Sequence, residues 1–153
     1  MEARHEYRVH AFGAGGRNGV VQAEGIQPTI SFGPPPEFQG EAGRWTPEHF
    51  LVAVVASCFV ITFEGLAQGS HFDFRSLRLA AEGVLGNEIG GWRFTEIRLR
   101  PIVTVQKEDD HDRAVRLLDK AEKSCLIARS LQCKVVLFPE VKIEEELSVP
   151  AKV

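Results

Sequence analysis

The sequence has few cysteines, no very long apolar run and no strong excess of charge of either sign. Three cysteines in 153 residues are too few for a disulfide framework, and they predict a reducing, cytoplasmic setting where any disulfide is transient. The longest apolar run, residues 50–63, is shorter than the roughly 20 residues that a bilayer span needs. Residues 1–10 are polar and contain no apolar stretch of the kind found in signal peptides. A net charge of -3, with interspersed signs, predicts neither nucleic acid nor an anionic membrane as a partner.

The composition is that of an ordinary folded domain. Hydrophobic residues make up 44% and charged residues 25% of the chain, which is close to average and far from disorder. The length suits one domain with a sizeable core. No linker or close internal repeat divides the sequence, so we expect a single domain over residues 1–153.

The first third of the chain predicts three strands. Apolar and polar residues alternate over residues 6–12, 19–26 and 28–32, and the glycine-rich stretch 13–19 predicts a turn. Residues 33–44 (GPPPEFQGEAGR) contain too much proline and glycine for regular structure. A meander followed by an irregular segment is therefore expected.

A long helix is predicted next. Thr46 can cap it, Pro47 suits its first position, and Glu48 favours the positive end of the helix dipole. The helix is expected to run to about Ala67 and to stop at Gly69. It is apolar nearly all round, which predicts burial on most sides. Because a lone domain of this size rarely encloses a helix so fully, we expect a subunit interface to cover part of it.

The second half predicts a hairpin, a second core helix and a final strand or broken pair of strands. The apolar stripe of this helix includes Cys125. The order βββα then ββαβ indicates an α+β fold with two core helices packed on antiparallel sheets. The expected elements are strands 74–84 and 92–106 with a turn near 86–91, a helix from 108–112 to about Ala128, and strand 132–138 with 141–143.

The cysteines are the residues that could carry chemistry. Cys58 and Cys125 each fall on the apolar surface of a predicted core helix, and the simplest interpretation is that both are small packed hydrophobes. The same structural interpretation applies to Cys133. A nucleophilic cysteine must be a thiolate, whereas an apolar pocket raises the pKa of a thiol. A nearby cation is then required, and arginine is the best choice because it stays charged when buried.

A buried arginine needs a carboxylate partner, so a Cys–Arg–Glu cluster is the most economical solution. The candidates are Arg17, which is otherwise a solvated turn residue, and Glu48, which is otherwise a helix-dipole residue. At about 1.5 Å rise per residue, Glu48 stands roughly 15 Å from Cys58 along the helix. If both serve one site, Glu48 comes from another subunit or the arginine bridges the gap.

Two cysteine-bearing segments carry a family resemblance. TPEHFLVAVVASCFVITF (residues 46–63) resembles the helix of the osmotically inducible protein C and organic hydroperoxide resistance superfamily, with Pro-Glu at its start and the reactive cysteine ten residues after the glutamate. KAEKSCLIARSL (residues 120–131) is similar to the family's second cysteine helix. AGGRNG and PPPEFQG are similar to family loops, and the resemblance covers nearly the whole chain.

The resemblance implies a role for each candidate. Cys58 would be the peroxidatic thiolate and Cys125 the resolving cysteine. Arg17 would hold the thiolate charged and Glu48 would pair with Arg17; Arg44 is an alternative arginine. The implied assembly is an intertwined homodimer with its sites at the subunit interface.

The implied activity is reduction of organic hydroperoxides to alcohols through a Cys58 sulfenic acid and a Cys58–Cys125 disulfide, which a dihydrolipoamide-type dithiol reduces. Val55, Phe59 and Phe63 would favour organic peroxides over hydrogen peroxide. No cofactor or metal is expected. Two alternatives remain open: a small-ligand binding protein with inert cysteines, and a redox sensor whose disulfide alters partner contacts.

Overall fold

The computed structural model describes residues 3–13 and 15–144. The chain divides into two compact units, Met1–Leu51 and Val52–Val153. The single domain expected over residues 1–153 stays a prediction.

The first unit contains an antiparallel meander of three strands, β1 (Val9–Gly13), β2 (Gly19–Ala23) and β3 (Ile26–Phe32). The first strand begins later than the alternating pattern predicts. The pairing of β1 with β2 starts at Val9, which lies opposite Ala23, the last residue of β2. Residues before Val9 therefore have no strand opposite them, and Tyr7 is almost fully exposed.

The proline- and glycine-rich segment is irregular, as predicted. It contains one short 3-10 helix, η1 (Pro36–Phe38). The end of this segment lies beside the end of β3, because the N–H of Gly33, directly after β3, donates to the carbonyl of Trp45 at 3.0 Å. The Trp45 ring stacks on Phe50 with 5.6 Å between ring centroids. These contacts fix the start of the following helix against the first unit's own chain.

The long helix α1 (Pro47–Gly69) begins as predicted, since the Thr46 hydroxyl accepts the N–H of His49 at 3.2 Å. Burial on most sides is not seen in the single chain, where Val54 and Ile61 are 43% and 71% exposed. With a mean hydropathy of 2.2 over an 18-residue window, α1 is also long and apolar enough to span a membrane by length and composition alone. One stripe at three- and four-residue spacing is buried: Val55, Phe59, Phe63 and Ala67.

The second unit is built on a twisted hairpin of β4 (Ser76–Glu88) and β5 (Gly91–Val105). β6 (Lys134–Leu137) and β7 (Glu140–Ile143) follow one another along β5, and both run parallel to it. The final element is thus the broken pair. The predicted antiparallel pairing is confirmed for the meander and for the β4–β5 hairpin. β6 and β7 depart from it, because a helical crossover returns the chain in the direction of β5.

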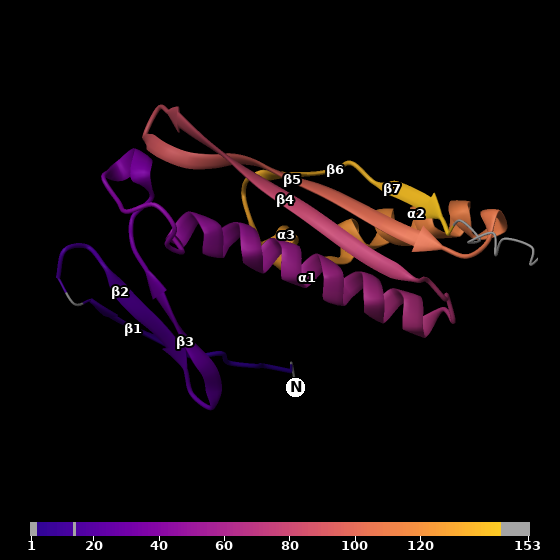
Figure 1. The fold of residues 1–153 in the computed structure, drawn as a ribbon, viewed down its shortest axis with the longest axis horizontal. Helices are drawn as coiled ribbons and strands as arrows, with labels where there is room; N and C mark the ends of the chain where they lie inside the picture. Colours follow the sequence, from indigo (N-terminus) through magenta and orange to yellow (C-terminus); the bar gives the residue numbers. More distant parts are fainter. Residues whose placement is uncertain (1–2, 14, 145–153) are drawn as a thin grey trace, which may run out of the picture. The chain divides into compact units, whose positions relative to one another are not determined.

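The core of the second unit lies between one face of this sheet and the helices α1 and α2 (His111–Ser124), which cover the same side (Figure 1). Alternation along β5 sends apolar side chains inward and charged ones outward. The fully buried residues of β5 are Ile97, Leu99, Pro101, Val103 and Val105. The residues of α2 with at most 8% exposure are Ala114, Leu117, Leu118 and Ala121.

The second predicted helix is interrupted at Cys125. A 3-10 turn, η2 (Glu108–Asp110), precedes α2, and α3 (Leu126–Ser130) follows it. Cys125 has φ -63° and ψ 110°, which is extended backbone. The prediction that Cys125 lies inside a continuous helix was wrong. The apolar stripe keeps its spacing across the break, and no glycine or proline marks the position.

Candidate active site

Cys58 and Cys125 come together although they are far apart in the sequence. Cys58 lies in α1 and is partly exposed, whereas Cys125 lies at the α2–α3 break and is fully buried. Both are free thiols, and the Cys125 thiol is hydrogen-bonded to Cys58. The break brings the second cysteine and the first amides of α3 to the sulfur of the first.

The pKa of Cys58 lies below that of an ordinary thiol. Burial alone would raise it, since a charged sulfur loses solvation. Four hydrogen-bond donors act in the opposite direction and together outweigh burial, because each stabilises the ionised sulfur: the N–H of Ile127, the thiol of Cys125, the hydroxyl of Thr62 and the N–H of Leu126. None of these four donors carries a charge, so neutral groups of the second unit already favour the thiolate.

The pKa of Cys125 is shifted in the opposite direction. Burial raises it most, the N–H groups of Ala128 and Ile127 oppose this, and the hydrogen bond and charge of Cys58 raise it further. When the first proton leaves the pair, it therefore leaves Cys58. The result is a Cys58 thiolate beside a protonated Cys125 thiol. A nucleophilic cysteine needs the thiolate form, and a resolving cysteine can stay protonated until it reacts.

The other two predicted site residues belong to the first unit. Arg17 stands in the turn before β2 with φ 65°, a left-handed conformation uncommon outside glycine. Its Nη1 donates to the carbonyl of Phe38 at 2.9 Å, and Arg44 pairs with Glu41 at 2.8 Å. Neither arginine bonds to Glu48, whose Oε2 is buried and has no hydrogen-bond partner among the described residues. The Arg17–Glu48 pair stays a prediction.

The apolar residues named from the sequence are not on the accessible side of Cys58. Val55, Phe59 and Phe63 are 0% exposed and belong to the core cluster. Val54 and Ile61, four residues before and three after Cys58, are exposed instead, and Leu126 is 66% exposed. A molecule approaching from solvent would meet these last three side chains.

Cys133 lies apart from the pair. It is partly buried and packs against the edge of the core, as the structural interpretation of this residue requires. It also lines a shallow hollow of about 230 Å³ with Lys123 and Arg129 among its walls. Cys133 is therefore a suitable control thiol for experiments on the pair.

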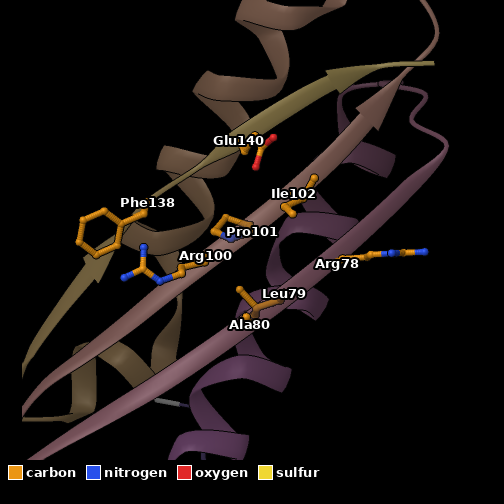
Figure 2. Close-up of a pocket in the computed structure, with 8 residues that line it drawn as sticks. All are labelled: Arg78, Leu79, Ala80, Arg100, Pro101, Ile102, Phe138 and Glu140. Carbon is orange, nitrogen blue, oxygen red and sulfur yellow. The ribbon is translucent and has the colours of Figure 1, made fainter. Parts of the chain in front are cut away.

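A separate hollow of about 430 Å³ lies on the outer face of the sheet (Figure 2). Its walls include the Arg100 guanidinium, which lies 4.5 Å from the centre of the Phe138 ring. Neither cysteine of the pair lines it. The lining residues are Arg78, Leu79, Ala80, Arg100, Pro101, Ile102, Phe138 and Glu140.

Reasoning from side chains missed the donors around Cys58. The sequence predicted a cation beside Cys58, because residue types reveal charged and polar side chains but not the positions of backbone amides. Two of the four donors are backbone amides at the α2–α3 break, and every residue except proline has such an N–H. Thr62, one helical turn after Cys58, was visible in the sequence through its hydroxyl and its four-residue spacing.

The fold and the two neighbouring thiols define an α+β protein with a pair of free cysteines between a core helix and a helix break. The family described as OsmC-like protein matches residues 40–138, which is more than half of the chain. The chain belongs to this family.

Relatives extend the match over nearly the whole length. YmaD of Bacillus subtilis, an uncharacterized protein, is 29% identical over 145 residues, covering 93% of this chain and 97% of YmaD. An OsmC-like protein of unknown function from Vibrio cholerae has a TM-score of 0.78 at 19% identity, covering 89% of this chain and 99% of that one. An organic hydroperoxide resistance protein from Legionella pneumophila has a TM-score of 0.74 at 22% identity, covering 93% and 100%. At these identities the structural matches show the shared α+β fold.

Proposed function

We propose that this protein reduces organic hydroperoxides to alcohols with Cys58 as the nucleophile and Cys125 as the resolving thiol. The observation that carries the proposal is the Cys58 thiol with a lowered pKa, hydrogen-bonded to a buried thiol whose pKa is raised. Family membership and a similar fold in two proteins named for organic hydroperoxide resistance support the substrate class.

The two thiols balance the reduction of one peroxide, and an external dithiol closes the cycle. The Cys58 thiolate attacks one peroxide oxygen, the O–O bond breaks, and the departing alkoxide takes a proton from water to become the alcohol. The resulting sulfenic acid on Cys58 is attacked by the sulfur of Cys125. Cys125 loses its proton, hydroxide leaves as water, and a disulfide forms. A dithiol then supplies two electrons and two protons and restores both thiols. A reducing compartment such as the cytoplasm suits this cycle.

Exposed apolar surface beside Cys58 supplies the preference for organic substrates. Leu126 offers such surface to an alkyl or aryl group, and burying it yields about 25 cal/mol per Å². Hydrogen peroxide has no apolar group to bury. We therefore expect the preference to appear mainly in kcat/KM.

A second copy of the chain would complete the site. The exposed apolar positions of α1 need cover, and the buried oxygen of Glu48 without a partner needs a donor, because an unpaired buried acceptor costs about 1–3 kcal/mol. An arginine held near Glu48 by dimer formation, Arg17 or alternatively Arg44, would satisfy it. The proposed assembly is a homodimer.

The test is consumption of cumene hydroperoxide with dihydrolipoamide as the reductant, alongside hydrogen peroxide. We expect catalytic turnover in the wild type and its loss in Cys58→Ser. Cys125→Ser should stop after one equivalent, with a Cys58 sulfenic acid trapped by dimedone. Cys133→Ser is the matched control and should turn over as the wild type does.

Two results would overturn the proposal. Absence of turnover in the wild type, with Cys58 and Cys125 both resistant to alkylation in the folded protein, would favour a binding protein with inert cysteines. One stoichiometric oxidation that dithiols do not reverse into further cycles would favour a redox sensor.

A further inference from the structure

Thr62 stands one helical turn after Cys58, and its side-chain oxygen lies near two acceptor atoms of that residue. Its hydroxyl donates to the carbonyl oxygen of Cys58 at 2.7 Å. The same oxygen, Thr62 Oγ1, lies 4.0 Å from Cys58 Sγ. A hydroxyl has one hydrogen to donate, so these two acceptors compete for it.

We propose that Thr62 is a positioning residue for the nucleophile, whose hydroxyl hydrogen turns from the Cys58 carbonyl to the Cys58 sulfur when that thiol ionises. The inference deepens the proposed function, because it assigns control of the Cys58 thiolate to a residue of the same helix. No cation and no second subunit take part in it.

The exchange between the two acceptors favours the sulfur only in the ionised state. A thiolate is a charged acceptor, and charge-assisted hydrogen bonds are roughly twice as strong as neutral ones. The carbonyl loses little, since the backbone N–H of Thr62 is its partner in the regular i to i−4 pattern of α1. With a protonated thiol the hydrogen stays on the carbonyl, the bond that the structure shows.

The position of Thr62 also restrains the sulfur. Threonine is β-branched and has few side-chain conformations in a helix, and its side chain is partly buried. A hydroxyl held by such a residue points the thiolate in one direction as well as stabilising its charge. The expected effect on chemistry is therefore on the ionisation of Cys58 rather than on the binding of peroxide.

The variants that isolate the hydroxyl are Thr62→Val, which keeps the shape, and Thr62→Ser, which keeps the hydroxyl. Ser57→Ala is the matched control. Ser57 is adjacent to Cys58 on the same helix, and its hydroxyl donates to the Val54 carbonyl at 3.2 Å. The variant therefore loses a similar hydroxyl bond, one that the structure places on a carbonyl alone.

The measurement is the rate at which iodoacetamide alkylates Cys58 in the full chain, followed by mass spectrometry of the Cys58 peptide over a range of pH. Thr62→Val should react about threefold to fivefold more slowly at pH values below the pKa of Cys58, as expected for loss of one hydrogen bond. Its rate should meet the wild-type rate at high pH, where the thiol is fully ionised. Thr62→Ser and Ser57→Ala should follow the wild-type profile.

Coincident profiles for Thr62→Val and the wild type at every pH would overturn the inference. A rate that stays low at high pH, or an equal slowing in Ser57→Ala, would also overturn it, because both indicate a general disturbance of the helix. The assay needs no peroxide turnover, so an inactive wild type with a Thr62-dependent alkylation profile would reject the proposed function and keep this inference.

Discussion

Replacing Leu126 by proline removes one backbone donor to Cys58 and leaves the local backbone undisturbed. Leu126 is the first residue of α3, the helix position that proline tolerates best. Cys125 before it has φ -63° and ψ 110°, the extended conformation that a residue preceding proline adopts. The leucine side chain is 66% exposed, so little packing is lost.

The size of the effect follows from the order of the donors. The N–H of Leu126 is the smallest of the four contributions that lower the pKa of Cys58. One hydrogen bond contributes about 0.5–1.5 kcal/mol net, and the sulfur is partly exposed, so the lower half of that range applies. About 0.7 kcal/mol corresponds to a roughly threefold smaller thiolate fraction below the pKa.

The assay is Cys58 alkylation against pH in Leu126→Pro and in Leu126→Ala, which keeps the N–H. Removing a donor to the thiolate raises the pKa, so Leu126→Pro should react about threefold more slowly at low pH and equally fast at high pH. Leu126→Ala should match the wild type. If both variants slow by the same factor, the side chain matters and the reasoning from the backbone amide is refuted.

Three further predictions concern stability, assembly and pH. Phe59→Ala should lower the free energy of unfolding in urea by about 3–5 kcal/mol, because Phe59 is 0% exposed; a loss below about 1 kcal/mol would contradict its place in the core. Ile61→Glu should leave a folded monomer in sedimentation if the exposed face of α1 is the homodimer contact, and an unchanged dimer would exclude that face. As pH rises and the protein stays folded, Cys58 should become alkylated before Cys125, because the pKa of Cys58 is lowered and that of Cys125 is raised. The reverse order in peptide mapping would contradict these opposite pKa shifts.

The order of elements could be predicted from the sequence because periodicity reports burial directly. Alternation marked β5, and Thr46 with Pro47 marked the start of α1. Alternation marks a strand only where a partner strand exists, and so the residues before Val9 were wrongly included in β1.

The break at Cys125 could not be predicted in the same way. Ala121 and Cys125 are both fully buried, and their four-residue spacing suits a continuous helix equally well. The change is confined to the backbone dihedrals of one residue, and no residue of high or low helix propensity signals it. The predicted pairing of Cys58 with Cys125 was therefore reached through family resemblance, while the amide donors that the break provides were not foreseen.

The donors around Cys58 have a consequence for electron transfer. They bind a thiolate and lose their charged acceptor when the sulfur enters a disulfide, so they stabilise the reduced pair relative to the oxidised one. A dithiol whose reduced form is stabilised has a more oxidising disulfide. In the proposed cycle the helix break would therefore tune the reduction potential of the pair, and an oxidised Cys58–Cys125 pair would be a disulfide that common dithiols reduce readily.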